Sequence, residues 1–553
     1  MIEMLLFLLL FGLGYGVMVW PIQCRYLQFF QQEEYDNRRF LEWWRERRAV
    51  EKRVTAFCLL LLALAAGAGL AKSQALGAIL SGQPWPVAVG LTAMLAWLGW
   101  GNRVKEAKKP LVFTTRIKRL LGVNHAIHFG ILYGGLHCMT PAQSVPSFVA
   151  FALLVVVLVF SLPLTLVLSN LVLSPFEARV QRNFLEEAKQ ILHQVRPRII
   201  GITGSYGKTS IKHILDHILN TTAPTLSTPG SVNTQMGITR IIRERLKKDH
   251  AYFIVEMGAY GIGSIRRLCE LTPPQAALVT AVGIAHYERF KTQEAVAEAK
   301  SELVQALPVD GLAVLNGDDP HCRAMAAKTQ SHCLFYGRNP EAGELHCRLL
   351  ADRLTAEGME CQMVFQEKEY TFLLPLYGNH QALNAAGAFL LACALGVPPI
   401  TAIAALRHVP GINHRLVVQK DPQGITTIDD AYNSNPVGFQ NALEVLEVLP
   451  GNKKILVTPG MVELGQRQEA EHAKLAPLAA RACTDIYLIA AHRIPGFKEA
   501  LLREGFAADR LREFPTLREA RAVLQQEIQP GDVLLFENDL PDLYETRQVF
   551  SFF

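Results

Sequence analysis

The sequence predicts an α-helical membrane domain of five spans, followed by two α/β domains, of which the first carries a phosphate-binding loop (P-loop) and the second is Rossmann-like. Three observations carry this prediction. Uncharged apolar runs are concentrated before residue 175, alternating strand and helix patterns fill the rest of the chain, and a glycine-rich loop joins the first such strand to a helix. The predicted domains are residues 1–175, 176–412 and 413–553.

The composition excludes several classes of protein. The chain has 553 residues, of which 50% are hydrophobic and 19% are charged, so disordered and fibrous proteins are excluded. The formal net charge of +5 is modest and does not indicate a nucleic-acid partner. The ten cysteines include no C-x-x-C pair, which argues against a zinc ribbon or a thioredoxin-like site.

Five apolar runs are the candidate membrane spans. They are residues 4–20, 55–71, 85–101, 122–139 and 147–174. The loops at 21–53 and 102–121 are rich in Lys and Arg, and the positive-inside rule places such loops in the cytoplasm. Five spans therefore predict a multi-pass protein of the cytoplasmic membrane, with its N-terminus outside and both α/β domains in the cytoplasm.

The run at 122–139 is the weakest of the five because it contains three histidines, His125, His128 and His137. Ionisable residues inside a membrane are candidates for proton transfer or ligand binding. Neutral histidines packed in a helix bundle are the favoured interpretation, since this run contains no acidic residue to pair with them.

Short β-branched runs alternate with helical patterns after residue 176. The first series of expected strands covers residues 197–202, 251–256, 276–280 and 311–315, and it predicts a mostly parallel sheet covered on both faces. Antiparallel strands are expected within 341–376 and a helix of small residues at 379–395. A second series covers 424–429, 453–458, 485–490 and 532–536, which places a domain boundary near residues 410–413.

Residues 201–210 read GITGSYGKTS and join a strand to a helix. Glycines allow a tight turn in which backbone N–H groups face phosphate oxygens, and the helix N-terminus adds its positive dipole end. Lys208 can reach the β- and γ-phosphates, and the Thr209 hydroxyl can bind Mg²⁺. Although Ile202 stands where the strict motif has its first glycine, this context predicts a nucleotide site.

This loop and the motifs after it resemble the Mur ligase family, the ATP-dependent amide ligases of peptidoglycan precursor synthesis. Within the family, the sequence is most similar to the enzymes that add D-alanyl-D-alanine. The resemblance runs from residue 198 to the C-terminus. Its motifs are Glu256-Met257-Gly258-Ala259, His286, Ala297-Glu298-Ala299-Lys300, Asn316-Gly317-Asp318-Asp319, Gly378-Asn379-His380, Asn413-His414-Arg415, Asp429-Asp430-Ala431-Tyr432-Asn433 and Glu463-Leu464-Gly465 with His472.

The resemblance implies an amide ligase that uses ATP and two Mg²⁺ ions and forms an acyl phosphate. The implied ATP-binding residues are Gly204, Ser205, Gly207, Lys208, Thr209, Ser210, Asn316, Asn384, Arg415 and Asp430. The implied metal ligands are Thr209, Glu256, His286 and Lys300, the last as a carbamylated lysine. The implied catalytic residues are Lys208, His286, Lys300 and Arg415, and the implied substrate-binding residues are Asn233, Tyr432 and Asn433.

Two departures from the family pattern affect the substrates. The predicted spans replace the soluble domain that grips the UDP end in cytosolic relatives, and Phe536-Glu537-Asn538-Asp539 replaces the usual Lys-Gly-Ser. The expected carboxylate partner is a muramoyl peptide, UDP-linked or lipid-linked in the bilayer. The expected amine is an amino acid or a dipeptide, and an acidic residue here could suit a cationic amine. A poly-γ-glutamate-type ligase is the alternative enzyme, and a nucleotide-binding transporter or scaffold without ligase activity is the less favoured one.

Overall fold

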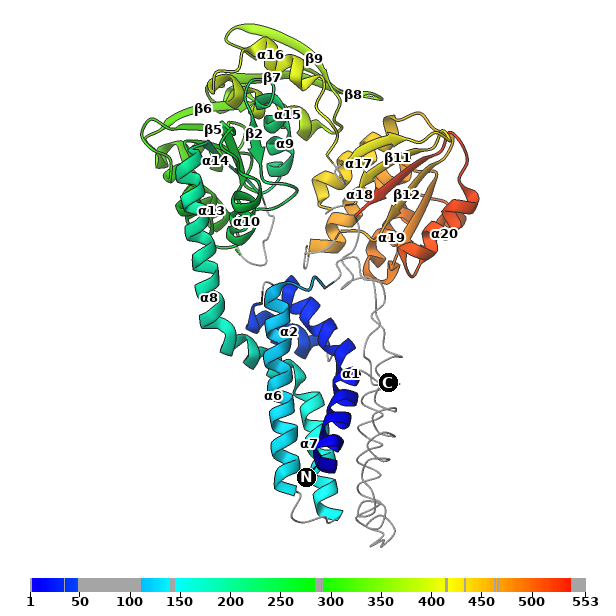
Figure 1. Ribbon diagram of the computed structural model, residues 1–553. Coiled ribbons are helices and arrows are strands. Elements are labelled where there is room, and N and C mark those ends of the chain that lie inside the picture. Colours follow the sequence, from blue (N-terminus) through cyan, green and yellow to red (C-terminus); the bar gives the residue numbers. More distant parts are fainter. Residues whose placement is uncertain are drawn as a thin grey trace. The chain divides into compact units, whose positions relative to one another are not determined.

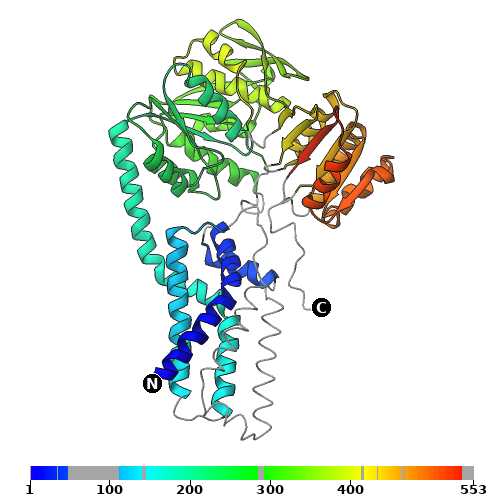
Figure 2. The same cartoon turned by 45° about the vertical axis from the view of Figure 1, so that its right-hand side comes forward.

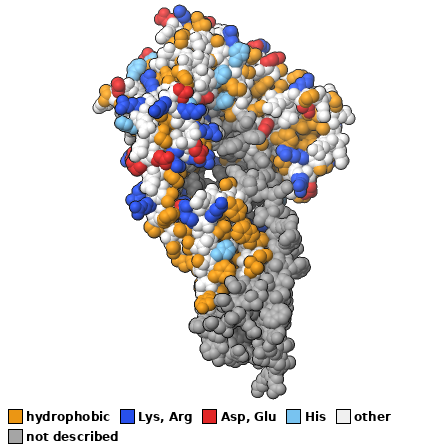
Figure 3. Space-filling view, viewed as in Figure 1, with side chains coloured by type: hydrophobic (Ala, Val, Ile, Leu, Met, Phe, Trp, Pro, Cys, Tyr) orange, Lys and Arg blue, Asp and Glu red, His pale blue; other side chains and the backbone are white. Residues whose placement is uncertain are grey.

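The computed structural model describes residues 2–33, 35–47, 111–139, 145–283, 290, 292–412, 416–431, 434–461, 464 and 467–538. The chain divides into two compact units, a helical one built on residues 1–180 and an α/β one of residues 181–540. Their described surfaces differ in chemistry. Hydrophobic side chains gather over the helical unit, whereas Lys, Arg, Asp and Glu are interspersed over the α/β unit (Figure 3).

The helical unit is held together by apolar contacts between its helices. Its described helices are α1 (Ile2–Gln32), α2 (Asn37–Arg47), α6 (Thr115–Met139), α7 (Val145–Phe160) and the first part of α8 (Leu162–Val195) (Figure 1). Leu27, Phe30 and Phe40 are completely buried in this core. Phe30 of α1 lies 4.8 Å from Phe40 of α2 between ring centroids, so the two helices pack closely.

Polar side chains are also buried between these helices. Gln23 donates a hydrogen bond of 2.8 Å to Asn124, which in turn donates one of 2.9 Å to Thr165. The His128 ring lies between the hydroxyls of Tyr15, at 2.7 Å, and Thr165, at 2.8 Å. Burial lowers the pKa of His128 to about 4, so its imidazole is neutral at neutral pH. For His128, this arrangement agrees with the favoured interpretation of a neutral packed histidine.

The predicted five-span membrane domain is wrong, because no single described helix is long and apolar enough to cross a membrane. Within the described part of the chain, one helix pair, Leu153–Phe160 and Leu162–Val195, meets that test together, and it is bent by 64° at the break. This break lies inside the predicted span 147–174, and Asn124 and His128 of the predicted span 122–139 belong to the buried polar network. The predicted spans at 55–71 and 85–101 lie outside the described residues. The predicted location in the cell stays a prediction.

The α/β unit begins with a mostly parallel sheet. Its strands are β1 (Arg198–Thr203), β2 (Thr225–Ser227), β3 (Tyr252–Glu256), β4 (Ala276–Val279), β5 (Leu312–Asn316), β6 (His332–Gly337), β7 (Cys347–Thr355), β8 (Gly358–Phe365) and β9 (Lys368–Leu374). Among the described strands, the order is β2-β3-β1-β4-β5-β6-β7-β8-β9. Pairs from β2 to β7 are parallel and the β7–β8–β9 pairs are antiparallel, which confirms the predicted pattern.

Helices cover both faces of this sheet, as predicted. The period of two along each strand sends Ile200 and Ile202 of β1 to one face and Ile199 to the other. The first face packs against α9 (Lys208–Leu219), α15 (Asn379–Ala394) and α16 (Pro399–Leu406). The second packs against the end of α8 and against α10 (Gln235–Arg245), α11 (Ser264–Leu271) and α13 (Gln293–Gln305).

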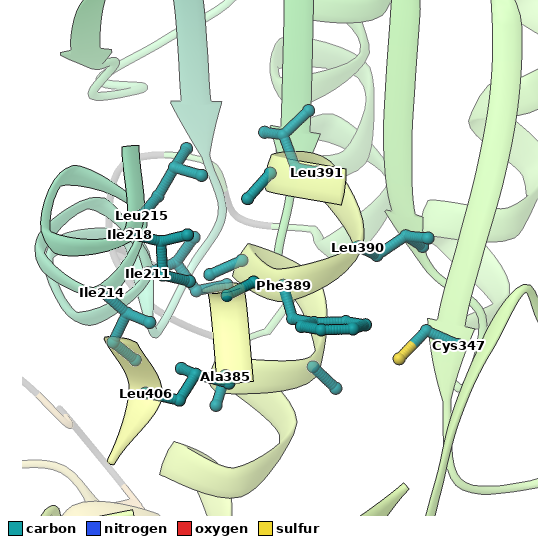
Figure 4. Packing of buried hydrophobic residues seen from close by; sticks show 14 of the residues in the cluster. Ile211, Ile214, Leu215, Ile218, Cys347, Ala385, Phe389, Leu390, Leu391 and Leu406 are labelled. Carbon is teal, nitrogen blue, oxygen red and sulfur yellow. The ribbon is translucent and has the colours of Figure 1, made fainter. Parts of the chain in front are cut away.

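The packing of α9 fixes the helix that follows the glycine-rich loop. Ile211, Leu215 and Ile218 recur at helical spacing, so they form one apolar face. This face meets Ala385 and Phe389 of α15 (Figure 4). The small residues of α15 allow the two helices to approach closely, and all these side chains are buried. The N-terminus of α9 is thus held at the end of β1.

A second sheet follows, as predicted for the C-terminal part. Its strands are β10 (Val417–Lys420), β11 (Thr426–Asp430), β12 (Lys454–Thr458), β13 (Asp485–Ile489), β14 (Leu511–Phe514) and β15 (Val533–Glu537), in the order β10-β11-β15-β12-β13-β14. Among the described strands of this second sheet, only the β10–β11 pair is antiparallel. Helices α17 (Pro436–Val448), α18 (Gln468–Ala482) and α19 (Pro495–Arg503) share the core of one face, and α20 (Leu517–Glu527) covers the other (Figure 2).

Candidate active site

The loop between β1 and α9 has the backbone geometry that a phosphate site needs. Gly204 and Gly207 have φ values of +153° and +78°, which favour glycine. A Cβ atom at Gly204 would collide with the Thr280 hydroxyl, and one at Gly207 would lie 2.7 Å from Asn384 Oδ1. Both positions therefore require glycine for space as well as for conformation.

The N-terminus of α9 is open to an anion. The N-cap residue is Gly207, and no side chain caps the helix. The backbone N–H groups of the first turn therefore have no side-chain acceptor at the cap. Lys208 Nζ donates hydrogen bonds to the carbonyl oxygens of Gly204, at 2.7 Å, and Ser205, at 3.4 Å. The lysine therefore curls over the loop, where its charge and the helix dipole act in the same direction on phosphate oxygens.

The carboxylate of Glu256 lies at the carboxyl end of β3, beside α9. Its Oε2 accepts a hydrogen bond of 3.0 Å from the Thr209 hydroxyl and lies 2.8 Å from Lys212 Nζ. Its Oε1 accepts a hydrogen bond of 3.4 Å from the Asn233 amide, whose Oδ1 accepts one of 2.9 Å from the Tyr260 hydroxyl. Thr209, Asn233 and Glu256, predicted from three separate segments, thus form one cluster.

Lys300 of α13 lies in the same region. It lines a small pocket together with Lys208, Asn233 and Tyr260. The Lys300 side chain is buried, and burial together with the Lys208 ammonium lowers its pKa well below the ordinary value. A pocket lined by two lysines suits a ligand that carries negative charge.

Asn384 of α15 lies against the glycine-rich loop, and Ser210 of α9 contacts α15 through Gln381. Asn384 Oδ1 is next to Gly207, and its Nδ2 donates a hydrogen bond of 3.3 Å to Gln381. Gln381 also donates to the Ser210 hydroxyl at 3.4 Å. Asn316, at the end of β5, donates to the Thr280 carbonyl at 2.7 Å, so in this structure its amide joins the ends of β4 and β5.

The remaining predicted residues are not all described. His286, Arg415, Tyr432 and Asn433 lie outside the described residues. Asp430 ends β11 of the second sheet, where its Oδ1 accepts a hydrogen bond of 3.0 Å from the Leu416 backbone N–H.

Lys212 and Tyr260 were missed by the reasoning from sequence, although both contact predicted residues. A signal for Lys212 was available, since residues three apart share one side of a helix and Lys212 follows Thr209 by that interval. No comparable signal marks Tyr260, because its contact with Asn233 depends on how two loops meet.

Comparison with known proteins agrees with this geometry. Residues 202–392 match the Mur ligase middle domain, and residues 414–537 match the Mur ligase, glutamate ligase domain. The UDP-N-acetylmuramoyl-tripeptide–D-alanyl-D-alanine ligase of Mycobacterium tuberculosis (strain CDC 1551 / Oshkosh) is 33% identical over 364 residues, covering 61% of this chain and 69% of the relative. The ligase of that name from Bacillus subtilis (strain 168) is 27% identical, covering 63% and 75%.

Solved structures show the same relationship. MurF from Acinetobacter baumannii aligns with a TM-score of 0.56 and 27% identity, over 66% of this chain and 78% of that one. MurF from Thermotoga maritima in complex with ADP aligns with a TM-score of 0.55 and 26% identity, over 65% and 80%. The chain therefore belongs to the Mur ligase family and is an ATP-dependent acid–amino-acid ligase.

Proposed function

We propose that this protein joins D-alanyl-D-alanine to the free carboxylate of a UDP-N-acetylmuramoyl-tripeptide at the expense of ATP. The relatives named for this reaction support the choice of substrates. The single observation that carries the proposal is the cluster of Lys208, Thr209, Asn233 and Glu256 around the open N-terminus of α9. The lipid-linked precursor considered from the sequence has no support from these relatives.

The reaction has two bond exchanges. A carboxylate oxygen of the peptide bonds to the γ-phosphorus of ATP, and the bond from that phosphorus to ADP breaks. The amine nitrogen of the dipeptide then attacks the acyl carbon, loses a proton, and displaces phosphate. Charge accumulates on the phosphoryl oxygens in the first exchange, and Lys208 with the N–H groups of α9 can stabilise that charge.

The described residues fit one Mg²⁺ ion bound together with ATP. Magnesium prefers oxygen ligands and commonly uses one or two carboxylates with substrate phosphates. The Glu256 carboxylate and the Thr209 hydroxyl supply such oxygens beside the phosphate loop. Bound there, the ion would neutralise charge on the transferred phosphoryl group. Among the described residues, no group of three or more His, Cys, Asp or Glu side chains could hold a metal.

Carbamylation of Lys300 is the second part of the proposal. A lysine must be neutral to add to carbon dioxide, and the buried position of Lys300 beside Lys208 favours the neutral amine. The product is an anion, which offsets the charge of Lys208 and offers further oxygen ligands. We expect a carbamate resonance in ¹³C NMR after equilibration with ¹³C-bicarbonate. The resonance should be missing from Lys300→Gln, and its presence in that variant would place the carbamate elsewhere.

The ligase reaction is tested with purified full-length protein, Mg-ATP and UDP-N-acetylmuramoyl-tripeptide. Separate reactions receive D-alanyl-D-alanine, D-alanine, L-glutamate or L-lysine, because Glu537 replaces a residue that is basic in the family pattern. Mass spectrometry should detect the added dipeptide with one ADP formed per product. Lys208→Ala should abolish product, whereas the surface variant Lys189→Met should retain it. Product with L-glutamate or L-lysine alone would overturn the proposed amine, and ATP hydrolysis without any adduct would overturn the ligase.

A further inference from the structure

Lys212 forms a buried ion pair whose role the proposed reaction does not explain. The side chains of Lys212 and Glu256 are 4% and 1% exposed, and Nζ lies 2.8 Å from Oε2. The same Nζ donates a hydrogen bond to the Gly230 carbonyl oxygen. One ammonium group therefore joins helix α9, the end of β3 and the loop that leads to Asn233.

Such a pair is costly to bury, so its partners must be well satisfied. Removing two charges from water is repaid only when geometry is good and other hydrogen bonds complete the site. Here Thr209 and Asn233 also donate to the Glu256 carboxylate. On the far side, the Glu256 backbone N–H donates to the Thr228 hydroxyl at 3.1 Å, in the same loop as Gly230. The loop and the carboxylate are thus fixed by one connected set of contacts.

We propose that Lys212 is a positioning residue whose ammonium acts as a built-in counter-ion, holding Glu256 and the loop at residues 228–233 in the metal-binding arrangement before a divalent cation arrives. This inference rests on the proposed magnesium site at Glu256. It concerns the assembly of that site, because Lys212 acts on the reaction only through Glu256 and Asn233.

Removal of Lys212 should make stability depend on magnesium, whereas removal of a purely structural lysine should not. With Lys212 present, Glu256 is neutralised whether or not magnesium is bound. With Lys212 removed, a buried carboxylate lacks a counter-ion until a divalent cation binds. Stability should then depend on magnesium in the variant far more than in the parent, since a ligand that binds only the folded state stabilises it.

The test compares thermal unfolding of the full chain with EDTA and with millimolar MgCl₂, without nucleotide. Lys212→Met should lower the unfolding midpoint in EDTA by roughly 10 °C, and magnesium should restore at least half of that loss. Lys212→Arg keeps the charge and should need magnesium less. The matched control is Lys189→Met, which removes an exposed lysine paired with Glu186 and should behave as the parent does.

Two results with Lys212→Met alone would overturn the inference. In one, Lys212→Met unfolds at the parent midpoint in EDTA. In the other, it loses the same stability with and without magnesium, which is the behaviour of a lysine that serves only packing. If Lys212→Met does not fold, the double variant Lys212→Met/Glu256→Gln removes both charges and should fold with a magnesium-independent midpoint, and failure of the double variant to fold would also overturn it. Because these unfolding measurements need no substrate, they can refute the proposed role of Lys212 without refuting the proposed ligase reaction.

Discussion

Two buried glutamates occupy equivalent places in the two sheets but have opposite surroundings. Glu256 is the last residue of β3 and Glu537 is the last residue of β15, and their exposed fractions are 1% and 0%. Glu256 faces the ammonium of Lys212 and two further hydrogen-bond donors. Glu537 accepts one hydrogen bond of 2.5 Å from Ser434, and no Lys, Arg or His in the described part of the chain forms an ion pair with it.

The neighbour of Glu537 is another carboxylate. Asp430 is its register partner on β11. Burial, followed by the charge of Asp430, raises the pKa of Glu537 well above its ordinary value. Burial and Asp430 therefore favour the neutral acid at Glu537, whereas Glu256 has the ammonium of Lys212 as a counter-ion. The end of a parallel strand is a common place for a functional side chain, but its partners decide whether a carboxyl group there can bind a cation.

The largest expected effect comes from removing the charge of Glu256. Glu256→Gln keeps the shape of the side chain but loses an anionic oxygen ligand for magnesium. We expect the rate of product formation to fall by about 10³-fold. Glu537→Gln, the corresponding change in the second sheet, should cost far less activity because burial and Asp430 already favour the neutral form of that carboxyl group. Equal losses of activity in Glu256→Gln and Glu537→Gln would contradict the difference between the two glutamates.

The next effect is on stability, and a double-mutant cycle measures it. Lys212→Met and Glu256→Gln each leave a buried group without its partner, so each should cost about 3 kcal/mol of unfolding free energy. The double variant leaves neither charge, and its loss should be well below the sum of the two. Denaturant unfolding of the parent, the two single variants and the double variant gives the coupling free energy between Lys212 and Glu256. Additive losses would show that the ion pair is not the source of either effect.

The pH dependence of stability should distinguish Glu537. An acid whose pKa is higher in the folded than in the unfolded chain stabilises the folded state at low pH, and this contribution is lost as the pH rises. The loss begins near the unfolded value, about pH 4.3. Glu537→Gln lacks this titration, so its unfolding free energy should rise relative to the parent over the range above about pH 5. A constant difference across that range would contradict the assigned state of Glu537.

The smallest expected effect concerns the hydroxyl that serves Glu537. Ser434→Ala removes a buried hydrogen bond and should cost about 1 kcal/mol in the parent. The cost should change little in Glu537→Gln, since an amide oxygen can accept the same bond. Chemical denaturation of both backgrounds measures this, and a loss several times larger in the parent would indicate an ionised Glu537.

Local patterns made much of the α/β unit predictable. Short apolar runs predict the strands β1, β3 and β5. The loop is predictable because Gly204 and Gly207 have positive φ values, which favour glycine. The Lys212–Glu256 pair depends on how α9 is turned against β3, which a local pattern does not specify. The prediction of membrane spans was wrong for a related reason. An apolar run at 147–174 does not reveal a bend of 64°, nor does one at 122–139 reveal that Asn124 bonds to a second helix.

The most direct test of the account follows the oxygen atoms of the carboxylate substrate. UDP-N-acetylmuramoyl-tripeptide labelled with ¹⁸O in its free carboxylate is incubated with the protein, Mg-ATP and D-alanyl-D-alanine, and the phosphate released is examined by mass spectrometry. Attack of the carboxylate on the γ-phosphorus predicts one ¹⁸O atom per phosphate, formed in step with the dipeptide adduct and about 10³-fold more slowly with Glu256→Gln. Unlabelled phosphate from the parent protein would mean that water attacks ATP, and would contradict ligase chemistry at this site.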